Sequence, residues 1–263
     1  MGRERHTIEN NFYEDVARGL FAQNSIMSAL GERESIGTTS TGEDIWRGNE
    51  LASAPTSHTT IPTPAAAGEQ MRIVSESAAD NGTSATGVLV VRLAYLDASG
   101  DEQTEDVTID GTTGVNTAAT DIRFVNDMYA ISVGSGGIAA GHIYLHKTGT
   151  AGLVYNMIAA GGNKSLVPHR MVPRAKVLVL KGWGASEGGG KRVNVRLRST
   201  DMSGVLRSGV FCFKGVTYLN QSTSPEMALN IAVPALSIVK VSGWAAALNA
   251  EVGCHWWGIL ENT

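Results

Sequence analysis

The sequence has little cysteine, few aromatic residues and little charge for its length. Only 2 of the 263 residues are Cys, which excludes a framework of disulfide bonds. Aromatic residues make up 6% of the chain and charged residues 17%, below the roughly 25% charged residues of an ordinary globular domain. No apolar run approaches the roughly 18 residues of a membrane-spanning helix, so no membrane span is expected. Residues 1–11 contain charges of both signs and no apolar stretch, so we expect no secretory signal.

Small residues take the place of the missing charged and aromatic ones. The chain contains 31 Gly, together with many Ala, Ser and Thr. This composition suits close-packed β layers joined by tight turns and excludes a charged, disordered chain. The formal net charge is only −4, so a specific nucleic-acid partner is not indicated.

The N-terminal segment, residues 1–31, has the helical pattern of the chain. Apolar side chains recur there every four residues, with one more beside them: Ile8, Phe12, Val16, Leu20 and Phe21. This spacing predicts a helix with one apolar stripe, and residues 25–30 are expected to form a second short helix that ends at a glycine. A helix of about four turns is marginal alone, so we expect residues 1–31 to be an anchor that docks on another subunit or partner.

Residues 32–68 have the composition of an extended arm. Proline recurs in this segment at positions 55, 62 and 64, which disfavours both helix and central strand. Ile45, Trp46 and Leu51 are too apolar for a free linker. We therefore expect the arm to lie along a surface and to contribute these three side chains to the anchoring interface.

From residue 69 onward the pattern changes to period two and becomes rich in β-branched residues. The predicted strands cover 70–75, 88–95, 106–109, 128–133, 142–145, 154–158, 177–183, 192–198, 210–218, 227–232, 237–242 and 254–260. Turn residues separate them and leave no room for crossover helices. The prediction is a mainly β protein: an antiparallel, jelly-roll-like β-sandwich over 69–263, preceded by the N-terminal helix and arm. Two sub-sandwiches, near 69–160 and 161–263, remain an alternative.

The strand at 192–198 has the clearest alternation. Val193, Val195 and Leu197 share one face, while Arg192, Arg196 and Arg198 share the other. Because an unpaired buried Arg is costly, the apolar face is expected in the core and the arginines are expected to form a basic ridge. Charge is also segregated along the chain: residues 76–127 are mainly acidic, and residues 170–214 are mainly basic. Opposed charges of this kind favour complementary docking between copies or with partners.

No pattern in the sequence indicates catalysis. His142 and His146 lie about 13 Å apart on a strand, too far for one metal ion. Cys254 and His255 are adjacent on a strand, so their side chains point to opposite faces. The string from Gly184 to Gly188 matches Gly-x-Ser-x-Gly, but no helix follows it as a nucleophile elbow requires. We therefore expect no enzyme activity, cofactor or metal.

Several short stretches resemble a known family. They are Asp44-Ile45-Trp46-Arg47-Gly48, Ile61-Pro62-Thr63-Pro64, residues 68–75, Leu93-Ala94-Tyr95-Leu96-Asp97, residues 107–112, Ile122-Arg123-Phe124-Val125 and Val133-Gly134-Ser135-Gly136. Over residues 40–145 the chain resembles the small virion structural proteins of tailed, short-tailed bacteriophages, of the tail-fibre and head-decoration kind.

The resemblance implies a structural protein of the virion, assembled in the host cytoplasm. It implies a homo-oligomer, with a trimer favoured, whose partners are other virion proteins such as a connector or adaptor, a nozzle or the capsid. The expected function is that of an oligomeric tail fibre or appendage attached to the head–tail connector through the N-terminal segment. Two alternatives stay open: a capsid decoration protein, and a module that binds a host-surface receptor or glycan through exposed tryptophans.

Overall fold

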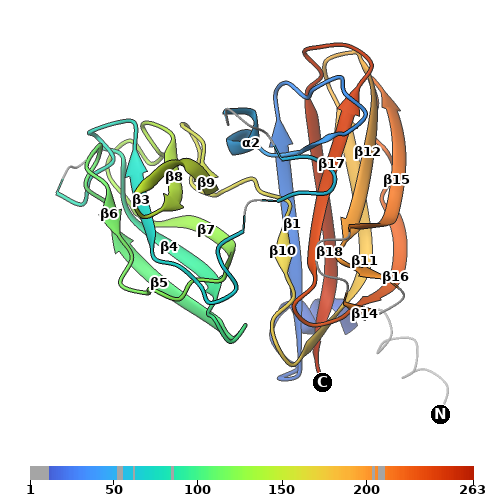
Figure 1. Ribbon diagram of the computed structural model, residues 1–263, viewed down its shortest axis with the longest axis horizontal. Helices are drawn as coiled ribbons and strands as arrows, with labels where there is room; N and C mark the ends of the chain where they lie inside the picture. Colours follow the sequence, from blue (N-terminus) through green and yellow to red (C-terminus); the bar gives the residue numbers. More distant parts are fainter. Residues whose placement is uncertain (1–11, 52–55, 62, 84–85, 203–204, 207–210) are drawn as a thin grey trace.

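The computed structural model describes residues 12–51, 56–61, 63–83, 86–202, 205–206 and 211–263, and nearly all of its regular elements are strands (Figure 1). Strands account for 53% of the chain and helices for 4%. The prediction of a mainly β protein is therefore confirmed.

Two sheets are built from the terminal parts of the chain, which we call the terminal lobe. The first has the strand order β1-β18-β11-β16, and the second has the order β10-β17-β12-β15, with β2 also paired to β17. Their strands are β1 (Asn24–Arg33), β2 (Glu43–Asp44), β10 (Arg170–Met171), β11 (Lys176–Glu187), β12 (Arg192–Ser199), β15 (Cys212–Asn220), β16 (Met227–Val233), β17 (Ile238–Ala245) and β18 (Val252–Asn262). Side chains from both sheets meet in one hydrophobic core around Trp183 and Trp256.

Two smaller sheets form the middle lobe, drawn in green in Figure 1. Their strand orders are β6-β3-β8-β9 and β5-β4-β7, and they share a second core around Ile73 and Leu93. The strands are β3 (Met71–Ser75), β4 (Val88–Leu96), β5 (Glu102–Thr108), β6 (Val115–Asn116), β7 (Phe124–Val133), β8 (Ile143–Lys147) and β9 (Thr150–Ile158). A short two-stranded sheet of β13 (Asp201–Met202) and β14 (Val205–Leu206) completes the described strands.

The expected jelly-roll-like β-sandwich is wrong. The strands instead form small antiparallel sheets of four, five, four and three strands, in an arrangement that resembles the four blades of a propeller. Period-two alternation identifies a strand and its buried face, but it does not say which strand pairs with which. The consecutive strands β11 and β12, for example, belong to different sheets.

The expected helix at residues 25–30 is also wrong, because these residues lie in β1. This strand pairs antiparallel with β18 along its whole length, from Asn24↔Glu261 to Arg33↔Val252. Met27 and Ala29 point into the core, whereas Leu30 is 55% exposed. A glycine and an arginine occupy the next two inward positions, which conceals the alternation in the sequence. Upstream of β1, residues 12–17 are helical, and Ile8 lies outside the described residues.

The described parts of residues 32–68 do not form an extended arm. Asp44 pairs with Ser242 where β2 joins β17, and the helix α2 (Arg47–Leu51) follows directly. Ile45 and Trp46 are fully buried within the chain itself. These two side chains therefore have no surface to offer a partner, which corrects their assignment as anchoring residues.

The two lobes meet through two small apolar clusters. One joins Leu96 and Phe124 of the middle lobe to Met171 and Ile238 of the terminal lobe. The other joins Trp46 to Met157 and Val167. Beside the first cluster, the Asn126 side chain donates to the Met171 carbonyl (3.0 Å) and accepts from the Met171 N–H (2.8 Å). The junction is therefore both apolar and hydrogen-bonded.

We predict that truncating a buried side chain of β1 destabilises the fold, whereas truncating an exposed side chain of the same strand does not. Replacing Met27 by Ala removes a buried side chain and should lower the free energy of unfolding by about 2–5 kcal/mol. Replacing Leu30 by Ala should change it by less than about 1 kcal/mol, because that side chain already faces solvent. Urea denaturation of both variants tests this alternation, and equal losses would contradict the strand.

Candidate functional site

The outer face of the second terminal-lobe sheet brings arginine and aromatic side chains together. Antiparallel register aligns strands β17, β12 and β15 in rows. Three rows cross this face: Lys240–Arg198–Phe213, Ser242–Arg196–Val216 and Trp244–Asn194–Tyr218. The alternation of β12 therefore places its arginines between aromatic residues of both neighbouring strands. We call Arg196, Arg198, Phe213, Tyr218 and Trp244 the aromatic–arginine face.

The guanidinium groups of this face stack on aromatic rings. Arg196 lies 4.7 Å from the ring centre of Phe213 and 4.4 Å from that of Trp244. Arg198 lies 4.2 Å from the Phe213 ring. Such cation–π contacts are worth about 0.5–2 kcal/mol each and hold the planar guanidinium in one orientation.

Exposure changes steadily across the face. Lys240 and Ser242 on β17 are fully buried, whereas on β15 Phe213 is 53% exposed and Tyr218 is 75% exposed. Arg198 is buried, and this burial together with the charge of Arg196 lowers the pKa of its guanidinium to about 10.

The expected basic ridge is therefore corrected. Arg192 is exposed, Arg196 is half-buried and Arg198 is covered, so the three arginines do not form one solvent-facing row. Besides Arg192, the aromatic side chains of Phe213 and Tyr218 reach solvent on this face.

A cavity of about 500 Å³ opens at the Trp244 end of the face. It is lined by polar and aromatic side chains of three strands, chiefly Arg192, Asn194, Tyr218 and Trp244. The site therefore combines flat rings, a guanidinium and amide groups in one place.

A fully buried charged pair lies beside this face. Lys240 Nζ is 2.8 Å from Asp44 Oδ1, and neither side chain has exposed surface. Burial raises the pKa of Asp44, and the charge of Lys240 opposes that rise. Burial likewise lowers the pKa of Lys240. The amine also lies 4.4 Å from the ring centre of Phe211.

His58 joins the pair to the aromatic–arginine face. Its Nδ1 is 2.6 Å from the Ser242 hydroxyl, and its ring stands edge-on to Trp244 at 5.3 Å. Burial, together with the nearby charges of Arg198, Arg196 and Lys240, lowers the pKa of His58 from 6.5 to about 3. The imidazole is therefore neutral in the folded protein at ordinary pH.

The residues expected to form one anchoring surface differ in burial and do not lie on one exposed face. Val16 is buried, and Phe12 packs against Phe21 with ring centres 5.4 Å apart. Leu20 and Phe21 are 67% and 41% exposed. Leu51 is the last residue of α2, and its side chain lies outside the part of the chain that the structure describes.

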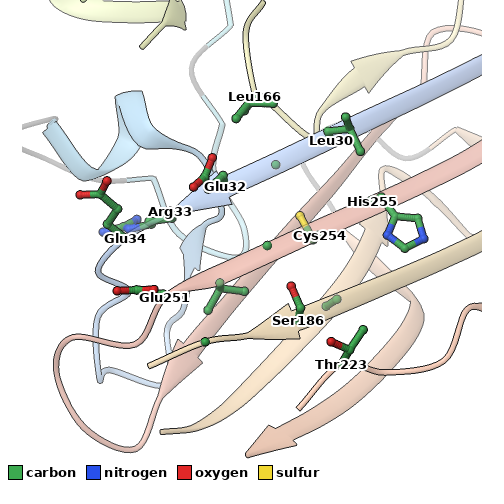
Figure 2. Close-up of a pocket in the computed structure, with 15 residues that line it drawn as sticks. Leu30, Glu32, Arg33, Glu34, Leu166, Ser186, Thr223, Glu251, Cys254 and His255 are labelled. Carbon is green, nitrogen blue, oxygen red and sulfur yellow. The ribbon is translucent and has the colours of Figure 1, made fainter. Parts of the chain in front are cut away.

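A second cavity, of about 470 Å³, lies between β1, β11 and β18 in the terminal lobe (Figure 2). Ser186, Cys254 and His255 are among the residues that line it. Ser186 is inside the strand β11, so no helix follows it as a nucleophile elbow would require. Burial raises the pKa of the Cys254 thiol far above its usual range, which keeps the thiol protonated and unreactive.

Within the described ranges, no group of three or more His, Cys, Asp or Glu side chains is placed to hold a metal ion. In the same part of the chain, no helix combines the length and apolarity needed to cross a membrane. Comparison of the chain with protein-family models, curated proteins and solved structures gave no match.

The sequence did not reveal Asp44, His58 or Lys240 as members of one cluster. The available signal is local: Lys240 stands alone in the otherwise apolar or small run of residues 237–243. A charged residue in the middle of a buried strand requires a partner. Nothing in the sequence, however, shows that the partner is almost 200 residues upstream.

We predict that His58 makes the fold acid-sensitive. The unfolded chain takes up a proton at this position as the pH falls through about 6.5, whereas the folded chain takes it up only near 3. The contribution of the neutral His58 imidazole to the free energy of unfolding is therefore complete above pH 6.5 and is lost as the pH falls toward 3.

The variant His58→Gln keeps a polar contact to Ser242 but does not titrate. Between about pH 7.5 and about pH 5, wild type should lose about 2 kcal/mol more unfolding free energy than the variant. Urea denaturation at the two pH values measures the difference. Equal losses in the two proteins would show that His58 is not the sensitive group.

Proposed function

We propose that this chain is a structural protein of a tailed-bacteriophage virion and that it works as a homo-oligomer. Its resemblance to the small virion proteins over residues 40–145 supports the class. The observation that carries the assembly role is the aromatic–arginine face, which exposes Tyr218 and Phe213 beside ordered guanidinium groups. Tyr, Trp and Arg are the residue types that dominate the binding energy of protein interfaces.

The proposed occupant of this face is a second copy of the chain. The middle lobe presents the edge strand β5, whose sequence includes Glu105 and Asp106 and whose side chains are mostly exposed. An acidic strand complements the guanidinium groups of Arg196 on this face and of Arg192 at its end. Such a contact joins different surfaces of the two copies, and we propose that it closes into a ring, of which a trimer is the smallest.

Attachment to the particle is assigned to the N-terminal segment. Leu20 is 67% exposed and Phe21 is 41% exposed, and both lie next to helical residues that touch the first terminal-lobe sheet through Tyr13 and Trp257. We propose that the protein is an appendage attached to the head–tail connector. The alternative is a head decoration protein, which would also need the N-terminal segment for attachment.

One observation favours a second candidate function, the binding of a glycan on a host surface. Trp244 is half-buried, and with Tyr218 it lines the cavity of about 500 Å³ at the end of the face. Flat rings beside amide and guanidinium groups suit the faces and hydroxyl groups of a sugar. In that case a soluble oligosaccharide should protect Trp244 from a fluorescence quencher.

We predict that Tyr218→Asp dissociates the oligomer. The substitution places a carboxylate where an exposed ring would be buried between copies, and it should raise the dissociation constant at least about 30-fold, equivalent to about 2 kcal/mol. Light scattering of the full-length protein at micromolar concentration measures the mass. The matched control is Leu30→Asp, since Leu30 is also exposed but lies on β1 of the first terminal-lobe sheet, outside both proposed contact surfaces.

Wild-type protein that stays monomeric at these concentrations would contradict the oligomeric role. Equal dissociation by both variants would show that the effect is not specific to the aromatic–arginine face. Protection of Trp244 by a sugar in a monomeric protein would favour the glycan-binding alternative.

A further inference from the structure

The buried pair Asp44–Lys240 has an unusual contact. The Lys240 amine is 2.8 Å from Asp44 Oδ1, yet this oxygen accepts no hydrogen bond from any described group. The amine instead donates to the backbone carbonyls of Ser57 (2.7 Å) and Thr60 (2.5 Å). The nitrogen is therefore held against the carboxyl group by other anchors.

The second carboxyl oxygen has a different environment. Asp44 Oδ2 accepts a hydrogen bond from the Thr56 hydroxyl at 2.5 Å, and this hydroxyl is also 3.0 Å from Asn49 Oδ1. One oxygen of the carboxyl group thus has a hydroxyl partner that can exchange protons, while the other lies against an amine.

Burial also favours the reactive protonation states. Two charges without exposed surface are expensive even when they are paired, and moving one proton from the amine to the carboxylate removes both charges. The directions of the two pKa shifts agree with this transfer: Asp44 is raised and Lys240 is lowered. Such a transfer would leave a neutral amine, which is a nucleophile, beside a neutral carboxylic acid.

We propose that Lys240 and Asp44 form an intramolecular amide bond that joins β17 covalently to β2. The lone pair of Lys240 Nζ attacks Asp44 Cγ, and the C–N bond forms. The hydroxyl oxygen, Oδ2, leaves with a proton from the amine as one molecule of water. Thr56 is the group placed to hydrogen-bond this oxygen as it departs. No oxidant, reductant or further reactant is needed.

The chain contains its own control pair. Lys214 Nζ lies 2.9 Å from Asp201 Oδ2, with 8% and 0% of the two side chains exposed. Here the amine donates a hydrogen bond to the carboxylate, and a second one, at 3.3 Å, to the backbone carbonyl of the same residue. This geometry is that of an ordinary ion pair, so Lys214 and Asp201 should remain unlinked.

The amide bond would fix the segment around β2 to the centre of the terminal lobe. It would close a loop that contains the whole middle lobe, so force applied at the N-terminal segment would pass directly to β17. This property goes beyond the proposed assembly role and does not depend on it.

Mass spectrometry of the wild-type, full-length protein tests the link. The intact mass should be lower than the sequence mass by one water molecule in essentially all molecules. Trypsin should not cleave after Lys240, so the digest should contain residues 34–47 branched onto residues 215–263. A full sequence mass, with separate peptides 215–240 and 241–263, would overturn the proposal.

Two variants locate the bond. Lys240→Arg should restore the full mass and the free peptide 34–47, whereas Lys214→Arg should keep the loss of one water. A loss of water that maps to another pair, or that persists in Lys240→Arg, would also overturn the proposal. The wild-type digest is decisive by itself if Lys240→Arg does not fold.

Discussion

The arrangement of the terminal lobe depends on the burial of one lysine and one aspartate. Taking two charges out of water costs several kcal/mol for each, so the surrounding chain must satisfy them. The carbonyls of Ser57 and Thr60 and the hydroxyl of Thr56 do so, which fixes this segment over strand β17. Ile45 and Trp46 follow Asp44 directly and are buried as a consequence. Trp46 then packs against Met157 and Val167, so the same constraint reaches the junction between the lobes.

The oppositely charged regions of the sequence form ion pairs with each other within this fold. The acidic residues 76–127 belong to the middle lobe, and the basic residues 170–214 belong to the terminal lobe. Opposite charges from the two regions meet at the junction in the pairs Asp101–Arg174, Glu102–Lys176 and Asp127–Arg170. The first two pairs are partly exposed and add little stability individually. Arg170 is buried, so its contacts to Asp127 and to neighbouring carbonyls restrict how the lobes meet.

The sequence predicted local features well and long-range pairing poorly. Val193, Val195 and Leu197 are all buried as expected, because alternation on a strand depends only on neighbouring residues. The pairing of β1 with β18 joins the two ends of the chain, and no local pattern carries that information. The buried Arg198 shows the same limit: its burial depends on Phe213 and Lys240, which flank it only after three strands have aligned.

The second terminal-lobe sheet is closed along one side and open along the other. On the β17 side, β2 and the residues around His58 cover the sheet. On the other side, β15 is the last strand of the sheet among the described residues, and its aromatic rings are exposed. An open apolar edge invites nonspecific pairing. The register of β15 against β12 shifts between Leu197 and Arg198, and such a bulge bends an edge strand away from the regular geometry that a further strand needs. Arg196, held between Phe213 and Trp244, is already ordered before any partner arrives. Because little side-chain entropy remains to be lost, this face favours a specific, complementary partner over indiscriminate strand addition.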